Sequence, residues 1–208
     1  MKLRIHTIRE DTRSEGPGHR FCVWTQGCLR RCSGCFARDT WDPQGGRELT
    51  LEDLCSLLSD RLERPPTLEG ITLLGGEPFL QAAALSRFAA FAREQGLSVF
   101  CFTGFTLEEL RASDDASALD LLSMVDVLAD GPYLKSQRDF GRPWVGSRNQ
   151  RFHFLTNRYA PDDFLGHRNR VEIRLRRDGS VALNGMADFF DLEVHETNAA
   201  TQASNNDQ

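Results

Sequence analysis

Residues 70–78 read Gly-Ile-Thr-Leu-Leu-Gly-Gly-Glu-Pro, and a helical pattern follows them from about residue 79 to residue 95. The short apolar run is typical of a buried strand, and Gly96 stands where a helix often ends in a left-handed conformation. A buried strand joined by a tight glycine turn to a helix is the repeating unit of a parallel sheet. The rest of the chain extends this pattern in both directions.

Strands and helices alternate on both sides of this unit. Thr50 is placed to cap a helix, with Asp53 three residues later to return the capping-box bond. Such alternation predicts βαβ units with right-handed crossovers, so the expected fold class is α/β. Strands are expected at residues 3–8, 20–26, 98–102 and 125–129, and helices at residues 51–61, 106–111 and 118–124, with a loop at residues 113–117.

The C-terminal third of the chain has a different character. Residues 135–150 are polar and punctuated by glycine, which predicts a long surface loop resembling a lid, and long ordered loops are often functional. Residues 151–155 are expected to be extended, and residues 170–183 to form an antiparallel hairpin around a turn at 177–180. The length of the chain suggests one domain over residues 1–195, followed by a polar, disordered tail at 196–208.

Residues 28–35 read Cys-Leu-Arg-Arg-Cys-Ser-Gly-Cys, within a loop at 27–46 that follows the strand expected at 20–26. Cys28, Cys32 and Cys35 are close enough to bind three corners of a 4Fe-4S cluster, and no fourth cysteine follows at a ligand-like spacing. One iron would therefore stay open to another ligand. A cluster that only carries electrons usually has all its irons bound by cysteine. The open iron therefore indicates that this cluster takes part in a reaction.

Zinc binding, disulfides and buried free thiols are the other uses that these cysteines could have. A structural zinc site needs four ligands, so it would have to recruit Cys22, Cys55, Cys101 or a distant histidine. A disulfide framework is disfavoured, because six cysteines among 208 residues do not make a cysteine-dense domain. Cys22 and Cys101 lie in apolar runs and Cys55 in a helical pattern, as expected for unrelated, buried thiols.

Three glycine-containing motifs each follow a predicted strand: residues 75–78, Thr103-Gly104 and Asp130-Gly131. Ligands bind open parallel sheets and barrels at the carboxyl ends of their strands, where glycine lets the backbone approach a ligand closely. Any one motif has the simpler interpretation of a strand-to-helix turn. Together with the cysteine loop, they predict four loops that converge on one rim, with Glu77 and Asp130 as carboxylates.

The composition and charge of the chain disfavour two classes of partner, nucleic acids and membranes. A net charge of -5 and a pI near 5.6 argue against nucleic acid as the main partner, since phosphate binding needs a clustered basic surface. Residues 1–13 are polar and charged, and no stretch approaches the ~20 apolar residues that span a bilayer. We therefore expect a cytoplasmic enzyme that binds neither nucleic acid nor a membrane.

The cysteine spacing and Gly75-Gly76-Glu77-Pro78 together resemble the radical S-adenosylmethionine (SAM) superfamily, in which the same two motifs occur. The resemblance extends to one subgroup, the activating enzymes of anaerobic ribonucleoside-triphosphate reductase and related glycyl-radical activases. Five further segments resemble this subgroup and occur in the expected order: residues 16–20, 34–41, 103–110, 126–133 and 146–151.

This resemblance implies an incomplete TIM-like barrel of parallel strands that holds a 4Fe-4S cluster on Cys28, Cys32 and Cys35. It further implies that SAM chelates the open iron and is cleaved reductively to a 5′-deoxyadenosyl radical. The radical would take a hydrogen atom from a glycine of a partner, a glycyl-radical enzyme. A flavodoxin- or ferredoxin-like protein would supply the electron.

Individual roles are carried over from the same motifs. Gly75, Gly76, Glu77 and Pro78 resemble the motif that receives the methionine ammonium. Phe36 is either an adenine contact or a core aromatic beside the cluster. Thr103, Gly104 and Asp130 would lie near the ribose or the methionine carboxylate, and Asn149 and Arg151 on the rim or the partner surface.

The chain departs from its relatives in two ways that keep other functions open. Val145 stands where many relatives have a basic residue, and the C-terminal hairpin makes the chain longer than compact activases. One alternative is a stand-alone radical SAM enzyme that modifies a small molecule or peptide. The other is a non-enzymatic electron carrier or metal-binding module, which would not bind SAM.

Overall fold

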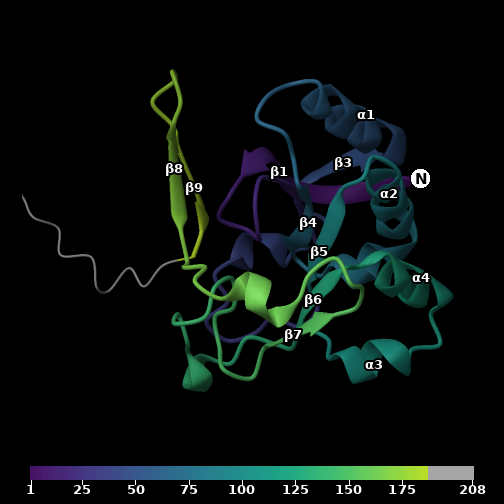
Figure 1. Ribbon diagram of the computed structural model, residues 1–208, viewed down its shortest axis with the longest axis vertical. Helices are drawn as coiled ribbons and strands as arrows, with labels where there is room; N and C mark the ends of the chain where they lie inside the picture. The colour runs from purple at the N-terminus through teal and green to yellow at the C-terminus, as the bar shows by residue number, and fades with distance from the viewer. Residues whose placement is uncertain (187–208) are drawn as a thin grey trace, which may run out of the picture.

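A computed structural model describes residues 1–186, so the tail expected at 196–208 lies outside the described residues. Seven strands form one sheet in the order β3-β1-β2-β4-β5-β6-β7, and two more form a separate hairpin, β8-β9 (Figure 1). The strands are β1 (Lys2–Thr12), β2 (Arg20–Thr25), β3 (Arg47–Thr50), β4 (Gly70–Gly75), β5 (Ser98–Phe102), β6 (Val127–Asp130), β7 (Arg151–Phe154), β8 (Val171–Leu175) and β9 (Val181–Gly185).

Four α-helices accompany the sheet: α1 (Leu51–Leu62), α2 (Ala82–Glu94), α3 (Leu107–Arg111) and α4 (Ala116–Met124). Short 3₁₀ turns occur at η1 (Arg38–Thr40), η2 (Pro78–Gln81), η3 (Lys135–Gln137) and η4 (Pro161–Phe164). None of the helices in residues 1–186 has the length and apolar character needed to cross a membrane.

The centre of the sheet is parallel and its margins are antiparallel. Strands β2, β4, β5 and β6 run parallel, joined by crossovers that contain helices, which confirms the α/β class. Strands β1, β3 and β7 pair antiparallel with their neighbours, so the expectation of a barrel of parallel strands is only partly met. The residues between β1 and β2 are too few for a parallel crossover, which needs about a dozen. Within the described residues the sheet is open, not a closed barrel.

The helices α1, α2 and α4 lie on one side of the sheet (Figure 1). Between them and the strands lies the larger apolar core, which includes Leu54, Leu85, Phe88, Val99 and Leu121. Helix α1 begins as predicted, with Thr50 and Asp53 forming the capping box. Helix α2 begins three residues later than expected, because Pro78–Gln81 first form a 3₁₀ turn whose start is capped by Glu77. Gly96 has the left-handed conformation expected after it, with φ +78°.

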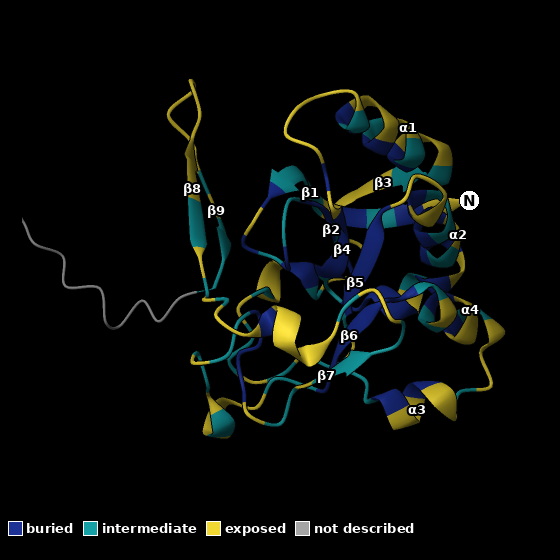
Figure 2. Cartoon of the chain, in the orientation of Figure 1, coloured by how far each residue is buried: buried dark blue, intermediate teal, exposed yellow. Residues whose placement is uncertain are grey.

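A second, smaller aromatic core covers the opposite face of β5 and β6. Side chains alternate along a strand, so Phe100 turns away from the helices while Val99 and Cys101 turn toward them. Trp144 and Val145 pack against Phe100 in this second core. Residues 135–150 are therefore not a surface loop throughout, since their apolar middle is buried (Figure 2).

Candidate functional site

The loop after β2 brings the three cysteines of the motif together. Its ends are held by two backbone bonds, from Gly27 N to the Thr40 carbonyl at 2.7 Å and from Cys28 N to the Trp41 carbonyl at 3.1 Å. Left-handed backbone at Arg31 (φ 44°) and Gly34 (φ +82°) curls the chain between these anchors. Cys28, Cys32 and Cys35 are half-buried and line the same cavity, of about 130 Å³.

The Gly-Gly-Glu turn after β4 lies directly against this loop. Gly76 N donates to Thr25 O, and Glu77 N donates to Gly27 O, both at 2.9 Å. A Cβ added at Gly76 would lie 2.3 Å from the Gly27 carbonyl oxygen, so only glycine fits there. Because β2 and β4 are parallel neighbours, their carboxyl ends place the two motifs side by side.

Glu77 joins this arrangement to the loop after β5. Its buried carboxylate accepts hydrogen bonds from Thr103 Oγ1 (2.8 Å), Gly104 N (2.8 Å) and Phe79 N (3.1 Å). Burial raises the pKa of Glu77, and these three donors act in the opposite direction. A carboxylate offers about four lone-pair positions, so three donors leave about one for a ligand.

The cavity around the cysteines also includes residues that the sequence did not single out. Trp41 and Tyr133 belong to segments that carried the family resemblance, but no role was assigned to their side chains. The indole Nε1 of Trp41 is buried and has no hydrogen-bond partner among the described residues, so it is a donor available to a ligand. The lining residues that had no predicted role are Arg30, Thr40, Trp41, Phe102, Tyr133 and Gln150. Gly131, from the fourth loop expected at this rim, also lines the cavity.

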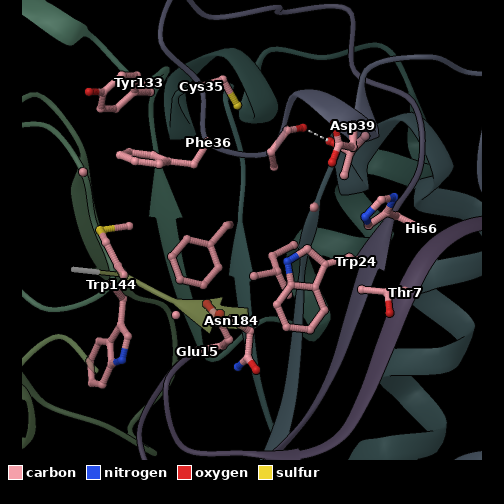
Figure 3. A pocket seen from close by; sticks show the side chains of 18 of the residues that line it. His6, Thr7, Glu15, Trp24, Cys35, Phe36, Asp39, Tyr133, Trp144 and Asn184 are labelled. Carbon is pink, nitrogen blue, oxygen red and sulfur yellow. Dashed lines mark hydrogen bonds between the residues drawn. The ribbon is translucent and has the colours of Figure 1, made fainter. Parts of the chain in front are cut away.

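A larger cavity of about 480 Å³ adjoins the first. The two share Cys35, Thr40, Gly75, Phe102, Tyr133 and Gln150 as lining residues. Figure 3 shows Phe36 beside Tyr133 and Cys35 at one end of this cavity, and Glu15 beside Asn184 at the other. Its volume lies in the range of roughly 300–1,000 Å³ that is usual for ligand pockets.

Phe36 is 62% exposed, which rules out the interpretation of a buried core aromatic. Its ring contacts Tyr133 and Phe140 edge-on, with centroid distances of 5.9 and 6.0 Å. One side of the ring faces the large cavity. Phe36 therefore offers an aromatic surface at the boundary between the cysteines and the larger space.

Comparison with known proteins identifies the family. Residues 14–153 match the model of the 4Fe-4S single cluster domain. The anaerobic ribonucleoside-triphosphate reductase-activating protein of Vibrio cholerae is 33% identical over 146 residues, 68% of this chain and 91% of that protein. The chain therefore belongs to the radical SAM activase family.

Two further relatives of this radical SAM protein agree with the assignment. The protein of the same name from Salmonella typhi is 29% identical over 157 residues, 74% of this chain and 99% of that one. The pyruvate formate-lyase 1-activating enzyme of Escherichia coli K12 is 37% identical over 131 residues, 59% of this chain and 53% of that one. Among solved structures, QueE from Escherichia coli covers 51% of this chain and 54% of its own at 19% identity and a TM-score of 0.41, too low to support an argument.

Two residues expected to bind a cofactor lie apart from the others in the radical SAM protein. Pro78 is buried at the start of η2 and lines neither cavity. Asp130 is fully buried and also lines neither. Its carboxylate accepts from Leu107 N at 2.7 Å and pairs with Arg151 at 2.5 Å, so it holds the start of α3 against β7. Despite burial, these donors lower the pKa of Asp130.

The arrangement of the three cysteines suits a 4Fe-4S cluster better than a single metal ion. No three His, Cys, Asp or Glu side chains in residues 1–186 converge so that they could hold one metal ion. Zinc requires all its ligands within about 2.3 Å of a single point, whereas each thiolate of a cubane cluster binds a different iron. Three half-buried thiols around one cavity therefore suit a cluster better than zinc. Cys22 and Cys101 are buried in strands, where burial raises the thiol pKa.

Proposed function

We propose that this protein is a radical SAM activase, which cleaves SAM reductively at a 4Fe-4S cluster and generates a glycyl radical on a partner such as anaerobic ribonucleotide reductase. One observation carries the proposal. The C-x₃-C-x₂-C loop and the Gly75-Gly76-Glu77 turn line the same cavity at the carboxyl ends of parallel strands. The names of the curated relatives support an activase over a stand-alone enzyme.

The thiolates of Cys28, Cys32 and Cys35 would hold the cluster. When bound, the reduced cluster supplies the electron that breaks the sulfonium–C5′ bond of SAM. The open position on Glu77 would accept a hydrogen bond from the methionine ammonium, and Thr103 and Gly104 keep that carboxylate in place. Charge-assisted bonds of this kind are among the stronger hydrogen bonds in proteins.

The larger cavity would take the remainder of SAM and the target glycine. Phe36 and Tyr133 offer aromatic surface for the adenine next to Cys35. Apolar walls at Phe102, Trp24 and Trp144 would limit the access of water to the bound ligand. We further propose that residues 1–195 act as one radical SAM domain, in which the open sheet is the incomplete barrel of this superfamily.

The cluster assignment is tested by anaerobic reconstitution. The C28A, C32A and C35A variants should each lose the visible absorption and the iron of a 4Fe-4S cluster. Cys55→Ala is the matched control, because Cys55 lies on α1 and lines neither cavity, and it should keep both. A cluster that depended on Cys55 would contradict the ligand assignment.

The activity is tested in two steps. With dithionite and SAM, the reconstituted protein should form 5′-deoxyadenosine, and none under verified reducing conditions would contradict a radical SAM enzyme. After mixing with the glycyl-radical enzyme of the same genome, electron paramagnetic resonance should detect a glycyl radical. Cleavage of SAM without any such radical would favour the stand-alone enzyme.

A further inference from the structure

The β8-β9 hairpin follows the part of the chain that matches the family model, which ends at residue 153. An isolated two-stranded hairpin is at best marginally stable in water, so this one depends on its contacts with the rest of the protein. Figure 1 shows it standing beside the sheet, on the side away from the helices. Its two faces differ in a way that indicates a binding surface.

The face turned toward the protein is polar. Asn184 donates to the hydroxyls of Thr12 and Ser14, both at 2.8 Å. Glu172 accepts from Arg13 N at 2.7 Å, and Arg174 donates to the carbonyl of Asp11. These bonds fix the hairpin to the end of β1 and the residues after it.

The opposite face is apolar and open to solvent. Cross-strand pairing sets Ile173 opposite Leu183 and Leu175 opposite Val181. These four side chains are 65, 56, 79 and 56% exposed, respectively. A hairpin that served only to cover a core would turn its apolar face inward, and exposed groups of large apolar side chains mark interaction sites.

This apolar face continues to the larger, 480 Å³ cavity. Leu183 belongs to the exposed face and also lines the 480 Å³ cavity, together with Asn184 and Gly185. A protein bound along the hairpin would therefore reach the cavity mouth. Such continuity is needed by a substrate that must insert one residue into the cavity and stay attached to a large protein.

The charge around the hairpin indicates the chemistry of the partner. Residues 168–178 contain four arginines, at 168, 170, 176 and 177, besides Arg174, which is bonded on the inner face, and only the two acids Glu172 and Asp178, in a chain whose net charge is -5. A second copy of this chain would bring the two sets of arginines together, and like charges across an interface are unfavourable. The fitting partner carries an apolar patch bordered by carboxylates.

We propose that the outer face of the β8-β9 hairpin docks the protein substrate, a glycyl-radical enzyme with an apolar patch bordered by acidic residues. This rests on the proposed function, and it adds a recognition surface that lies outside the matched family domain. The hairpin aligns the partner so that its target segment enters beside Leu183. Removing the apolar face weakens docking but does not change the rate of the reaction in the docked complex.

The test uses the reconstituted full chain and the purified anaerobic ribonucleoside-triphosphate reductase encoded in the same genome. The I173T/L175T/V181T variant replaces three exposed apolar side chains by threonine, a β-branched residue that strands favour. Its KM for the reductase should rise about tenfold or more while kcat stays unchanged. The reason is that a few residues carry most of the binding energy of an interface. Leu119→Thr, on α4 and 41% exposed, is the matched control and should leave KM unchanged.

A second variant covers the case in which the first does not fold. R176E/R177E reverses two charges beside the hairpin turn and should weaken binding of the reductase, more strongly at low salt than at high salt. Calorimetry measures this binding without radical chemistry, so it separates docking from the proposed function. Unchanged binding in both variants, a fall in kcat at constant KM, or loss of a self-associated form of the free protein would each overturn the docking proposal.

Discussion

Thr103 donates its hydroxyl to the carboxylate of Glu77 at 2.8 Å, and this bond joins the loop after β5 to the loop after β4. Gly104 N donates to the other carboxylate oxygen, also at 2.8 Å. Glu77 N in turn donates to Gly27 O, at the start of the cysteine loop. One glutamate therefore connects the carboxyl ends of three parallel strands around the proposed cluster.

Replacing Glu77 by glutamine should lower both the free energy of unfolding and the affinity for SAM. The amide nitrogen would face a backbone donor, either Gly104 N or Phe79 N, and leave a buried hydrogen bond unmade. Such a loss costs about 1–3 kcal/mol, so the free energy of unfolding in urea should fall by that amount. The Kd for SAM should rise as well, because the neutral amide no longer attracts an ammonium.

Two controls separate the role of Glu77 from a general loss of stability. Glu52→Gln alters an exposed carboxylate on α1 and should change the free energy of unfolding by no more than about 0.5 kcal/mol. Thr103→Val removes the hydroxyl that orients Glu77, whereas Thr103→Ser keeps it. Equal affinities for SAM in these two Thr103 variants would contradict the orienting role.

Gly76 should be irreplaceable for steric reasons alone. A Cβ there would lie 2.3 Å from the carbonyl oxygen and 2.9 Å from the carbonyl carbon of Gly27, so Gly76→Ala must push the cysteine loop away. The expected cost is about 1–3 kcal/mol of unfolding free energy, with a reduced iron content after reconstitution. Gly96→Ala meets no atom within 4 Å and only strains a left-handed residue, which costs about 1 kcal/mol. Full iron loading of Gly76→Ala would contradict the close approach.

The sequence predicted most of the elements and the convergence of four loops, because both depend on local patterns. Strand β3 was missed, since Arg47–Thr50 is a short, polar edge strand that only backbone pairing with β1 defines. The burial of Trp144 and Val145 was missed for a related reason. Their polar neighbours predicted a surface loop, and the aromatic core that receives them is assembled from distant strands.

The assignment of side chains within the site was harder than its location. Asp130 follows a strand, as a ligand-binding carboxylate should, but Arg151 and the start of α3 already occupy it. Tyr133 and Gln150 line the cysteine cavity because the chain after β6 folds back over it. Spacing along the sequence does not encode such contacts, and the family resemblance of residues 126–133 and 146–151 marked only the segments that contain them.

Arg20, in the Gly-Pro-Gly-His-Arg segment of the family resemblance, should be essential for folding. Its fully buried guanidinium donates to Thr72 Oγ1 at 2.7 Å, to Ser98 Oγ at 3.0 Å and to the Pro17 carbonyl at 3.1 Å. Arg20→Lys cannot reach all of these acceptors from one ammonium, so a loss of about 3–5 kcal/mol in unfolding free energy is expected. Arg87→Lys, exposed on α2, is the matched control. A stable Arg20→Lys protein would show that the network tolerates rearrangement.

Glu15 should make the stability of the protein depend on pH. Burial raises the pKa of its carboxyl from 4.5 to about 7, against the lowering effect of hydrogen bonds from Gly185 and Asn184. Because the folded state holds the proton more tightly than the unfolded state, this contribution to stability is complete below pH 4.5. It is lost as the pH rises through about 7, at up to about 1.4 kcal/mol per pH unit.

The measurement compares urea unfolding of the reduced apo protein and of Glu15→Gln from pH 5 to pH 8. The glutamine variant does not titrate at this position, so the difference in unfolding free energy between the two proteins should change by roughly 3 kcal/mol at most over this window. Cys22 and Glu172 also act on the charge of Glu15. Burial raises the pKa of Cys22, which keeps its thiol neutral throughout, and Glu172→Gln serves as the control. A difference that stays constant with pH would show that Glu15 is ionised in the folded protein over the whole window.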